Sequence, residues 1–264
     1  MPRKRRNKPL FRVKISEKGR RVRRPFLLSR VRAVACLGLG LGALALPSTA
    51  WAASRGYIVT EFDSIRVEAP VRVILTAGAG VTARGEGDRA ALDRVDLAVS
   101  GGVLTVRMNE DRDAGFAPSS GAEAPLLILS TGQLRRASLM GGGVLTIHAL
   151  SGQEAVLAMN GNGEISADGI DVERLSLFIG GGGRLTARGR AGTVRVTVNG
   201  PGALEAEGLD AHGATVSNDG PGTVRLGVHG PASVVSTGSG DTLLSGKPIC
   251  TVTQRGVGRV ICMK

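Results

Sequence analysis

The cysteine and histidine side chains are the residues of this chain whose types best suit catalysis or metal binding. Beyond residue 52 the chain has two cysteines, Cys250 and Cys262, and three histidines, His148, His212 and His229. The histidines fall at different positions of the repeat described below, so they do not stack into a metal site. No Ser, His and Asp set stands at a recognisable nucleophile elbow. The sequence therefore predicts no catalytic residue, no metal site and no cofactor.

The two cysteines suit a structural bridge. Cys250 and Cys262 both occupy repeat positions that elsewhere hold apolar, inward-facing residues. An even pair of cysteines in an exported protein favours a disulfide, which here would hold the last repeat against fraying. The alternative is two buried free thiols that act as small apolar side chains.

A Gly-x-Gly element that returns seven times organises the C-terminal half of the chain. Its spacings are 20, 20, 19, 20, 18 and 18 residues. A period this regular indicates a solenoid, in which each unit buries its apolar face only against its neighbours. The glycines supply either a positive φ or a close backbone approach. The element begins at Gly141, Gly161, Gly181, Gly200, Gly220, Gly238 and Gly256.

Apolar residues alternate with polar ones on both sides of each Gly-x-Gly. This period of two predicts two short strands per repeat, each with one buried face. A helical solenoid would need about 34 residues per repeat, so each repeat is predicted to be one coil of a parallel β-helix. The column four residues after the first glycine reads Leu145, Ile165, Leu185, Leu204, Val224, Thr242 and Val260.

Outward-facing charges alternate in sign between successive repeats. Stacked strands lie about 4.8 Å apart, so these charges are expected to pair between adjacent coils, each pair contributing roughly 0.2 to 1 kcal/mol. We interpret them as ladders that set the register, which leaves few carboxylates for catalysis. The expected pairs are Glu164 with Arg184, Glu205 with Arg225, Asp241 with Arg259, and Asp168 with Arg188.

The basic charge of the chain is concentrated at its start. Residues 1–32 contain 14 Lys and Arg and one acidic residue, Glu17, a net charge of +13 against +12 for the whole chain. The remaining residues therefore carry a net charge of −1. A nucleic-acid partner is excluded for the folded part, because it lacks the basic surface that such binding needs.

Residues 1–52 are predicted to be a signal peptide with a long basic n-region. An apolar stretch, Ala33 to Leu46, is followed by Pro47 and the small-residue site that ends at Ala52. This pattern predicts cleavage between Ala52 and Ala53, by either the general or the twin-arginine export route. The apolar stretch is too short to span a bilayer well, and no later stretch approaches its length, so no transmembrane segment is expected in the mature protein.

Residues 53–264 are predicted to form one β-helical domain. Its irregular N-terminal coils span 55–132 and its regular Gly-x-Gly coils span 133–264, and Tyr57 and Phe62 are expected to help cover the N-terminal end. The loop at 107–125 is the one long interruption. Because loops on rigid scaffolds often bind ligands, it is a candidate binding loop; a polar insertion without a partner is the alternative. Its candidate residues are Asp111, Arg112, Asp113 and Phe116.

Three segments carry a resemblance to a known family. They are Val59–Val67, the strand Val71–Leu75, and the motif Gly-x-Gly-x-(Leu/Ile)-x-Ala-x-Gly at Gly161–Gly169 and Gly200–Gly208. The sequence from Tyr57 to Cys262 resembles the GIN domain, a domain of unknown function also described as an auto-transporter adhesin head. The resemblance implies an all-β fold, a single-stranded right-handed parallel β-helix with coils of roughly 19 residues. It brings no catalytic residues.

Two functions are consistent with these observations. The first is an exported, non-enzymatic envelope protein, periplasmic or at the cell surface, that acts as an adhesin or scaffold by binding a protein or polysaccharide. The second is an enzyme that acts on polysaccharide, by analogy with other parallel β-helices. The two differ in whether acidic residues converge on one groove or pair coil by coil. Stacking of aromatic rings on sugars is disfavoured, because few aromatic residues follow residue 52.

Overall fold

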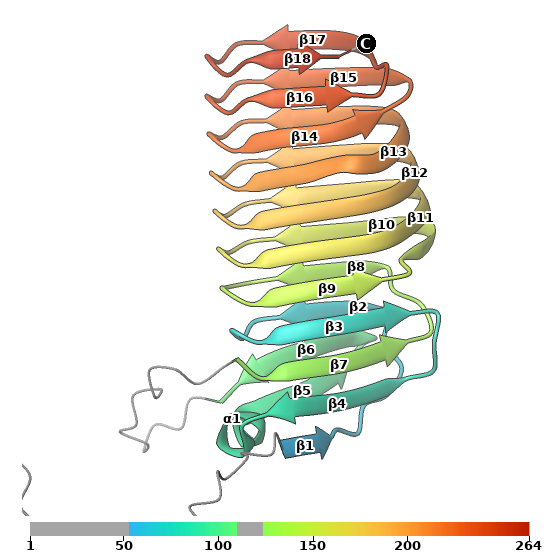
Figure 1. Ribbon diagram of the computed structural model, residues 1–264, viewed down its shortest axis with the longest axis vertical. Helices are drawn as coiled ribbons and strands as arrows, with labels where there is room; N and C mark the ends of the chain where they lie inside the picture. Colours follow the sequence, from blue (N-terminus) through green and yellow to red (C-terminus); the bar gives the residue numbers. More distant parts are fainter. Residues whose placement is uncertain (1–52, 110–123, 264) are drawn as a thin grey trace, which may run out of the picture. The chain divides into compact units, whose positions relative to one another are not determined.

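The computed structural model describes residues 53–109 and 124–263, and these fall within one compact unit. Their strands form one 18-stranded sheet that winds into a parallel β-solenoid (Figure 1). Within the described residues the one helix is α1 (Arg89–Arg94). The predicted all-β fold of stacked parallel coils is therefore confirmed.

The regular coils are built from strands that pair in parallel with the strands of the coils before and after them. In β11, β12 and β13 the strand continues around the bend of the coil, so each is 15 or 16 residues long. This differs from the expected two short strands per repeat, because the hydrogen-bonded ladder continues on both sides of the bend. The regular strands are β8 (Arg136–Leu139), β9 (Val144–His148), β10 (Ser151–Met159), β11 (Glu164–Ile179), β12 (Arg184–Val198), β13 (Ala203–Asn218), β14 (Thr223–Val228), β15 (Pro231–Ser236), β16 (Thr242–Ser245), β17 (Ile249–Gln254) and β18 (Val260–Cys262).

The core lies inside the coils and follows the predicted alternation. Leu177 stands beside Val196, which in turn stands beside Val216, so that equivalent apolar residues stack along the axis. All three side chains are buried. Each buried Leu or Val stabilises the fold by about 1.5 to 3 kcal/mol relative to an exposed position, and the stacking makes every coil depend on its neighbours.

Close approach between coils, rather than a positive φ, explains the repeated glycines. A Cβ atom on Gly181 would lie 2.2 Å from the carbonyl oxygen of Gly161 in the preceding coil. Of the seven first glycines only Gly141 has a positive φ, of 120°. The middle position of the turn is open, because a Cβ on Gly142 would meet no atom within 4 Å. The motif is therefore Gly-x-Gly because only the outer two residues face the next turn.

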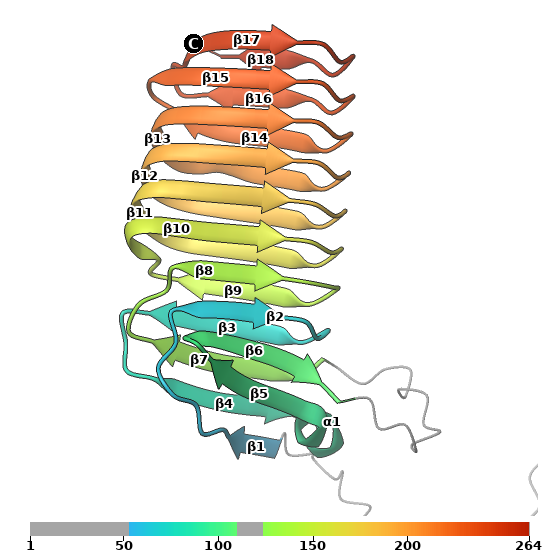
Figure 2. The ribbon, with the colours of Figure 1, turned by 180° about the vertical axis from the view of Figure 1, so that it is seen from behind.

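The N-terminal coils are irregular, and they do not stack in chain order. The pair β2 (Ser64–Val67) and β3 (Arg72–Ala77) lies between the pair β6 (Val103–Met108) and β7 (Leu126–Thr131) and the pair β8 and β9 (Figure 2). All four ladders around β2 and β3 are parallel. The chain thus forms a middle layer first and later returns on both sides of it.

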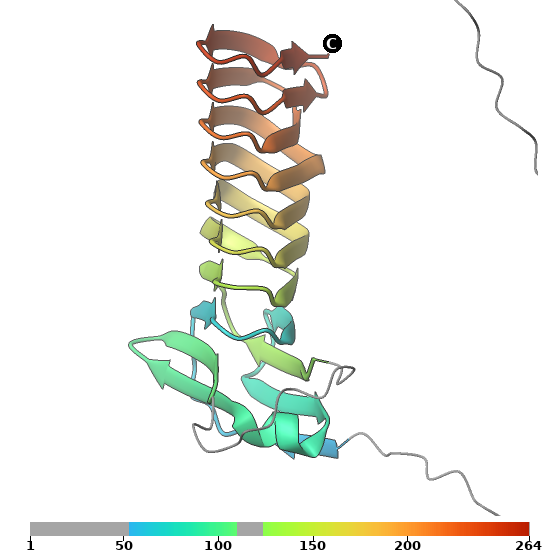
Figure 3. The same cartoon turned by 90° about the vertical axis from the view of Figure 1, so that its left-hand side faces the viewer.

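Antiparallel strands and the short helix close the N-terminal end, where the sheet departs from the line of the regular coils (Figure 3). Strand β4 (Thr82–Gly87) pairs with β7 and with β1 (Ala53–Gly56), and β5 (Val95–Ser100) pairs with β6. Asp88 caps α1 by accepting a hydrogen bond from the backbone N–H of Ala91. The Tyr57 hydroxyl donates to the carbonyl of Leu92 at 3.0 Å, and Phe62 is buried.

A disulfide joins the two strands of the last coil. Cys250 in β17 and Cys262 in β18 have Cα atoms 6.7 Å apart and are bonded through their sulfur atoms. Their neighbours in the coil beneath are Ala232 and Leu244, which are both buried. The bridge therefore continues two core columns into the terminal coil, in place of two free thiols.

Candidate functional site

Ion pairs between adjacent coils occupy many of the charged side chains. Arg259 Nη2 lies 2.6 Å from Asp241 Oδ2, and Arg188 Nη1 lies 3.2 Å from Asp168 Oδ1. Hydrogen bonds from the side chain and backbone N–H of Arg259 hold the pKa of the Asp241 carboxyl below its ordinary value. These two predicted pairs are confirmed, and they act in register-setting because each joins consecutive layers of the sheet.

Arg184 forms its ion pair with a different residue from the one expected. Glu164 stands directly beside Arg184 in the ladder between β11 and β12. The guanidinium nevertheless pairs with Glu205 in β13, a residue whose direct neighbour is Thr186. The expected pairing with Glu164 was wrong because a long arginine side chain reaches diagonal neighbours as well as direct ones.

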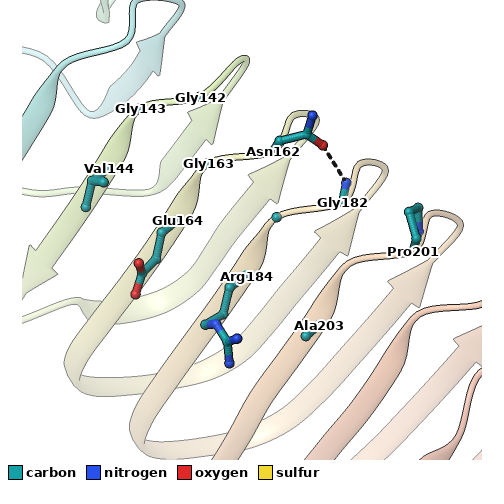
Figure 4. A pocket seen from close by; sticks show the side chains of 11 residues that line it. Gly142, Gly143, Val144, Asn162, Gly163, Glu164, Gly182, Arg184, Pro201 and Ala203 are labelled. Atoms are coloured by element: carbon teal, nitrogen blue, oxygen red, sulfur yellow. Dashed lines mark hydrogen bonds between the residues drawn. The ribbon is translucent and has the colours of Figure 1, made fainter. Parts of the chain in front are cut away.

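A shallow groove runs across the glycine turns of successive coils (Figure 4). It encloses about 370 Å³ and is lined mainly by turn backbone. Asn162 Oδ1 accepts a hydrogen bond from the Gly182 N–H at 3.2 Å, which ties one turn to the next. Glu164 is the one carboxylate of the lining and Arg184 is already paired with Glu205. The groove therefore lacks the second acidic group that general acid and base catalysis of glycoside cleavage needs.

A larger recess, here named the crossover cavity, opens where the chain passes from the N-terminal coils to the regular ones. It has a volume of about 740 Å³. The ladder between β10 and β11 begins at Ser151, whereas the ladder between β10 and β8 begins at Val156. The first part of β10 therefore has no layer of β8 beside it, and this gap is the recess. Its lining is Asp63, Ser64, Gln133, Arg135, Arg136, Gly152, Gln153, Glu154, Val156 and Arg174.

The charged groups of the crossover cavity are held more loosely than those of the ladders. Arg135 Nε lies 3.8 Å from Asp63 Oδ2, and Arg174 Nη2 lies 3.6 Å from Glu154 Oε2. Neither distance is that of a hydrogen bond. Arg136 is exposed and, within the described part of the chain, its side chain has no ion-pair or hydrogen-bond partner. The cavity thus presents guanidinium donors that remain available to a ligand.

The candidate residues predicted from the sequence lie mostly outside the described structure. The loop residues Asp111, Arg112, Asp113 and Phe116 fall within 110–123, and Ala52 precedes the first described residue. Ala53 is the first residue of β1. These predictions therefore remain predictions.

The crossover cavity was missed from the sequence. Arg135 and Arg136 are adjacent basic residues at the start of the regular coils, and neither belongs to a charge ladder of the repeat. That departure from the pattern was the available signal. Its spatial partners Asp63 and Arg174 could not be found, because they depend on which strands pair.

Neither a metal centre nor a membrane-spanning helix is found among residues 53–109 and 124–263. No three His, Cys, Asp or Glu side chains in these ranges are grouped so as to hold a metal ion. No helix in these ranges combines the length and the apolar character needed to cross a bilayer.

The stacked parallel coils define the chain as a β-solenoid protein. A family model described as "Putative auto-transporter adhesin, head GIN domain" matches residues 61–248. The chain therefore belongs to this family, as its repeated motif and opening segment indicate. No curated protein matches the chain at a significant level.

Several crystal structures share the fold. A "putative adhesin" from Bacteroides fragilis is 17% identical, with a TM-score of 0.68 over 81% of this chain and 98% of that one. A "putative lipid binding protein" from Parabacteroides distasonis is 16% identical, with a TM-score of 0.64 over 82% of this chain and 98% of that one. At these identities the likeness shows the fold alone.

Proposed function

We propose that this protein is an exported, non-enzymatic binding module of the cell envelope, periplasmic or displayed at the surface, that recognises an envelope or cell-surface ligand. The observation that carries the proposal is the crossover cavity, a polar recess of about 740 Å³ on a rigid stack of coils. The names given to the family and to the similar structures describe adhesin-like binding and agree with this role. The ligand is a protein or a polysaccharide.

The arrangement of acidic residues argues against the alternative of an enzyme that cleaves polysaccharide. The two carboxylates of the crossover cavity, on Asp63 and Glu154, each face a guanidinium. A neighbouring positive charge favours the ionised form of a carboxyl group, whereas glycoside cleavage needs one carboxyl group that stays protonated. The geometry therefore supports binding without chemistry.

The test is a binding comparison with product analysis. Residues 53–264 contain every described strand and the whole core, so this segment is a suitable sample. It is measured against purified envelope polysaccharides, envelope proteins and whole cells, and each polysaccharide is then analysed for cleavage products. Binding without products is the expected result. Cleaved polysaccharide, or no binding to any of these samples, would contradict the proposal.

The candidate binding loop and the signal peptide are tested separately. Deleting Asp111–Ser120 is expected to reduce binding to cells if the loop contributes contacts. A loop that serves only as a polar insertion would leave binding unchanged. For the signal peptide, the mass of the exported protein is expected to place its new N-terminus at Ala53, which a retained N-terminal segment would contradict.

A further inference from the structure

We propose that the crossover cavity binds the anionic groups of an acidic polysaccharide, with Arg136 as the principal contact. This inference rests on the proposed function, because it names the ligand class of the same surface. The anionic groups are carboxylates or sulfates, both of which accept charge-assisted hydrogen bonds from guanidinium groups.

The guanidinium groups of the cavity differ from those of the ladders in what already engages them. In the ladders, Arg259 donates two side-chain hydrogen bonds to Asp241. In the cavity, Arg174 reaches Glu154 only at 3.6 Å, and Arg136 has no partner within the described residues. An arginine fork matches a planar carboxylate and forms two parallel hydrogen bonds with it. An incoming anion would thus find donors that do not first have to leave a strong partner.

A local positive site is needed for this binding, because the folded chain as a whole does not attract anions. Outside residues 1–32 the net charge is −1. The cavity gathers three guanidinium groups against the two carboxylates of Asp63 and Glu154. Two amide side chains, Gln133 and Gln153, add neutral donors at its rim. Recognition of an anion at this place is therefore a property of the cavity and not of the overall charge.

The scarcity of aromatic rings favours an acidic sugar over a neutral one. Neutral sugars are commonly bound by stacking on aromatic faces, yet no aromatic residue lines the cavity. Phe62 is buried and the Tyr57 hydroxyl is engaged with Leu92 at the N-terminal end. Hydrogen bonds to charged groups are the stronger interaction that remains available.

A polymer fits the surface better than a small anion, because polar positions continue from the cavity along the stack. Arg136 and Val156 begin an outward column that parallel ladders carry through every regular coil. Successive members of such a column lie about 4.8 Å apart, so a sugar chain lying along the axis can meet several of them. The later members are Ser176, Arg195, Thr215, Ser233 and Thr251.

The test compares three polysaccharides and two arginine variants. Residues 53–264 are titrated with polygalacturonate, with its carboxyl-reduced neutral form, and with dextran sulfate. Arg136→Gln is expected to weaken binding of the preferred anionic polymer about tenfold, which corresponds to about 1.4 kcal/mol. The matched control is Arg225→Gln, which removes the same charge from an exposed residue of β14, outside the cavity. It is expected to change the affinity by less than about twofold.

The outcomes separate this inference from the proposed function. Stronger loss with Arg136→Gln than with Arg225→Gln supports the inference, and the better of the two anionic polymers identifies the group that is bound. Equal losses in the two variants would overturn it, as would binding to the neutral polymer that matches binding to the charged ones. If cells are bound but none of the three polymers is, the inference fails while the proposed function stands.

Discussion

Replacing Gly181 with alanine tests whether close packing between coils dictates the repeated motif. A Cβ atom there would lie 2.2 Å from the carbonyl oxygen of Gly161 and 2.8 Å from its carbonyl carbon. An ordinary contact begins at 3.4 Å, so the two turns would have to separate locally by about 1.2 Å, the difference between 3.4 and 2.2 Å. The obstructing atoms belong to the backbone and cannot rotate away as a side chain would.

The expected loss of stability is about 3 kcal/mol. Overpacking a close contact costs about 1 to 3 kcal/mol. The carbonyl oxygen of Gly161 also accepts a hydrogen bond from the N–H of Gly183 at 3.0 Å, and displacing it costs about 1 kcal/mol more. Because each coil is covered by its neighbours, the effect should extend to the adjacent turns.

The measurement is urea denaturation of residues 53–264 followed by far-ultraviolet circular dichroism. Gly142→Ala is the matched control, because this glycine lies in an equivalent turn and a Cβ there would meet no atom within 4 Å. It is expected to be neutral or to stabilise the protein by up to about 1 kcal/mol, through the reduced entropy of the unfolded chain. Equal destabilisation by Gly181→Ala and Gly142→Ala would refute the reasoning.

Three further predictions concern the C-terminal coils. Replacing Cys250 and Cys262 by serine opens a loop with a sequence separation of 12, and the expected cost is up to about 3 kcal/mol; faster amide exchange in the last coil is the measurement, and unchanged exchange there would contradict it. Asn218→Ala removes a buried amide that donates to the carbonyls of two turns, so urea denaturation should show a loss of about 2 kcal/mol, and a loss near zero would be inconsistent with those bonds. Asp241→Asn is expected to lower stability at neutral pH. The pKa of Asp241 is depressed by Arg259, so its contribution is present above the ordinary value of 3.8 and is lost as pH falls below it; a difference from wild type that persists at pH values well below 3.8 would argue against the pair.

The regular coils could be predicted because a period near 20 residues and a period of two act together in them. Leu185 and its equivalents mark the inward face, and the glycines mark the turns. Their chemistry left two reasons for glycine open. The structure favours close approach, since the spacing of the coils at the turn leaves no room for a Cβ atom at Gly181.

The N-terminal part was less predictable because its strands have the same alternation and no distinguishing turn. Nothing in Ile65 or Val67 specifies whether β2 pairs with β6, with β8, or with both, and the pairing depends on the whole fold. Helix α1 had a weak local signal, Asp88 as cap before Arg-Ala-Ala-Leu-Asp-Arg. The crossover cavity follows from the same unpredictable pairing, because it forms where β8 enters the stack.

The position of β2 and β3 within the stack constrains the order in which the chain can fold. Ser64 pairs with Val103 on one side and with Arg136 on the other, so both of its neighbours come much later in the sequence. Beyond β8, each coil instead finds its partner about 20 residues further along the chain. Closing long loops is entropically costly and slows folding. A polypeptide that emerges from an export channel with its N-terminus first would therefore present strands that wait, unpaired, until more than half of the chain has followed, whereas the last coils can add one at a time.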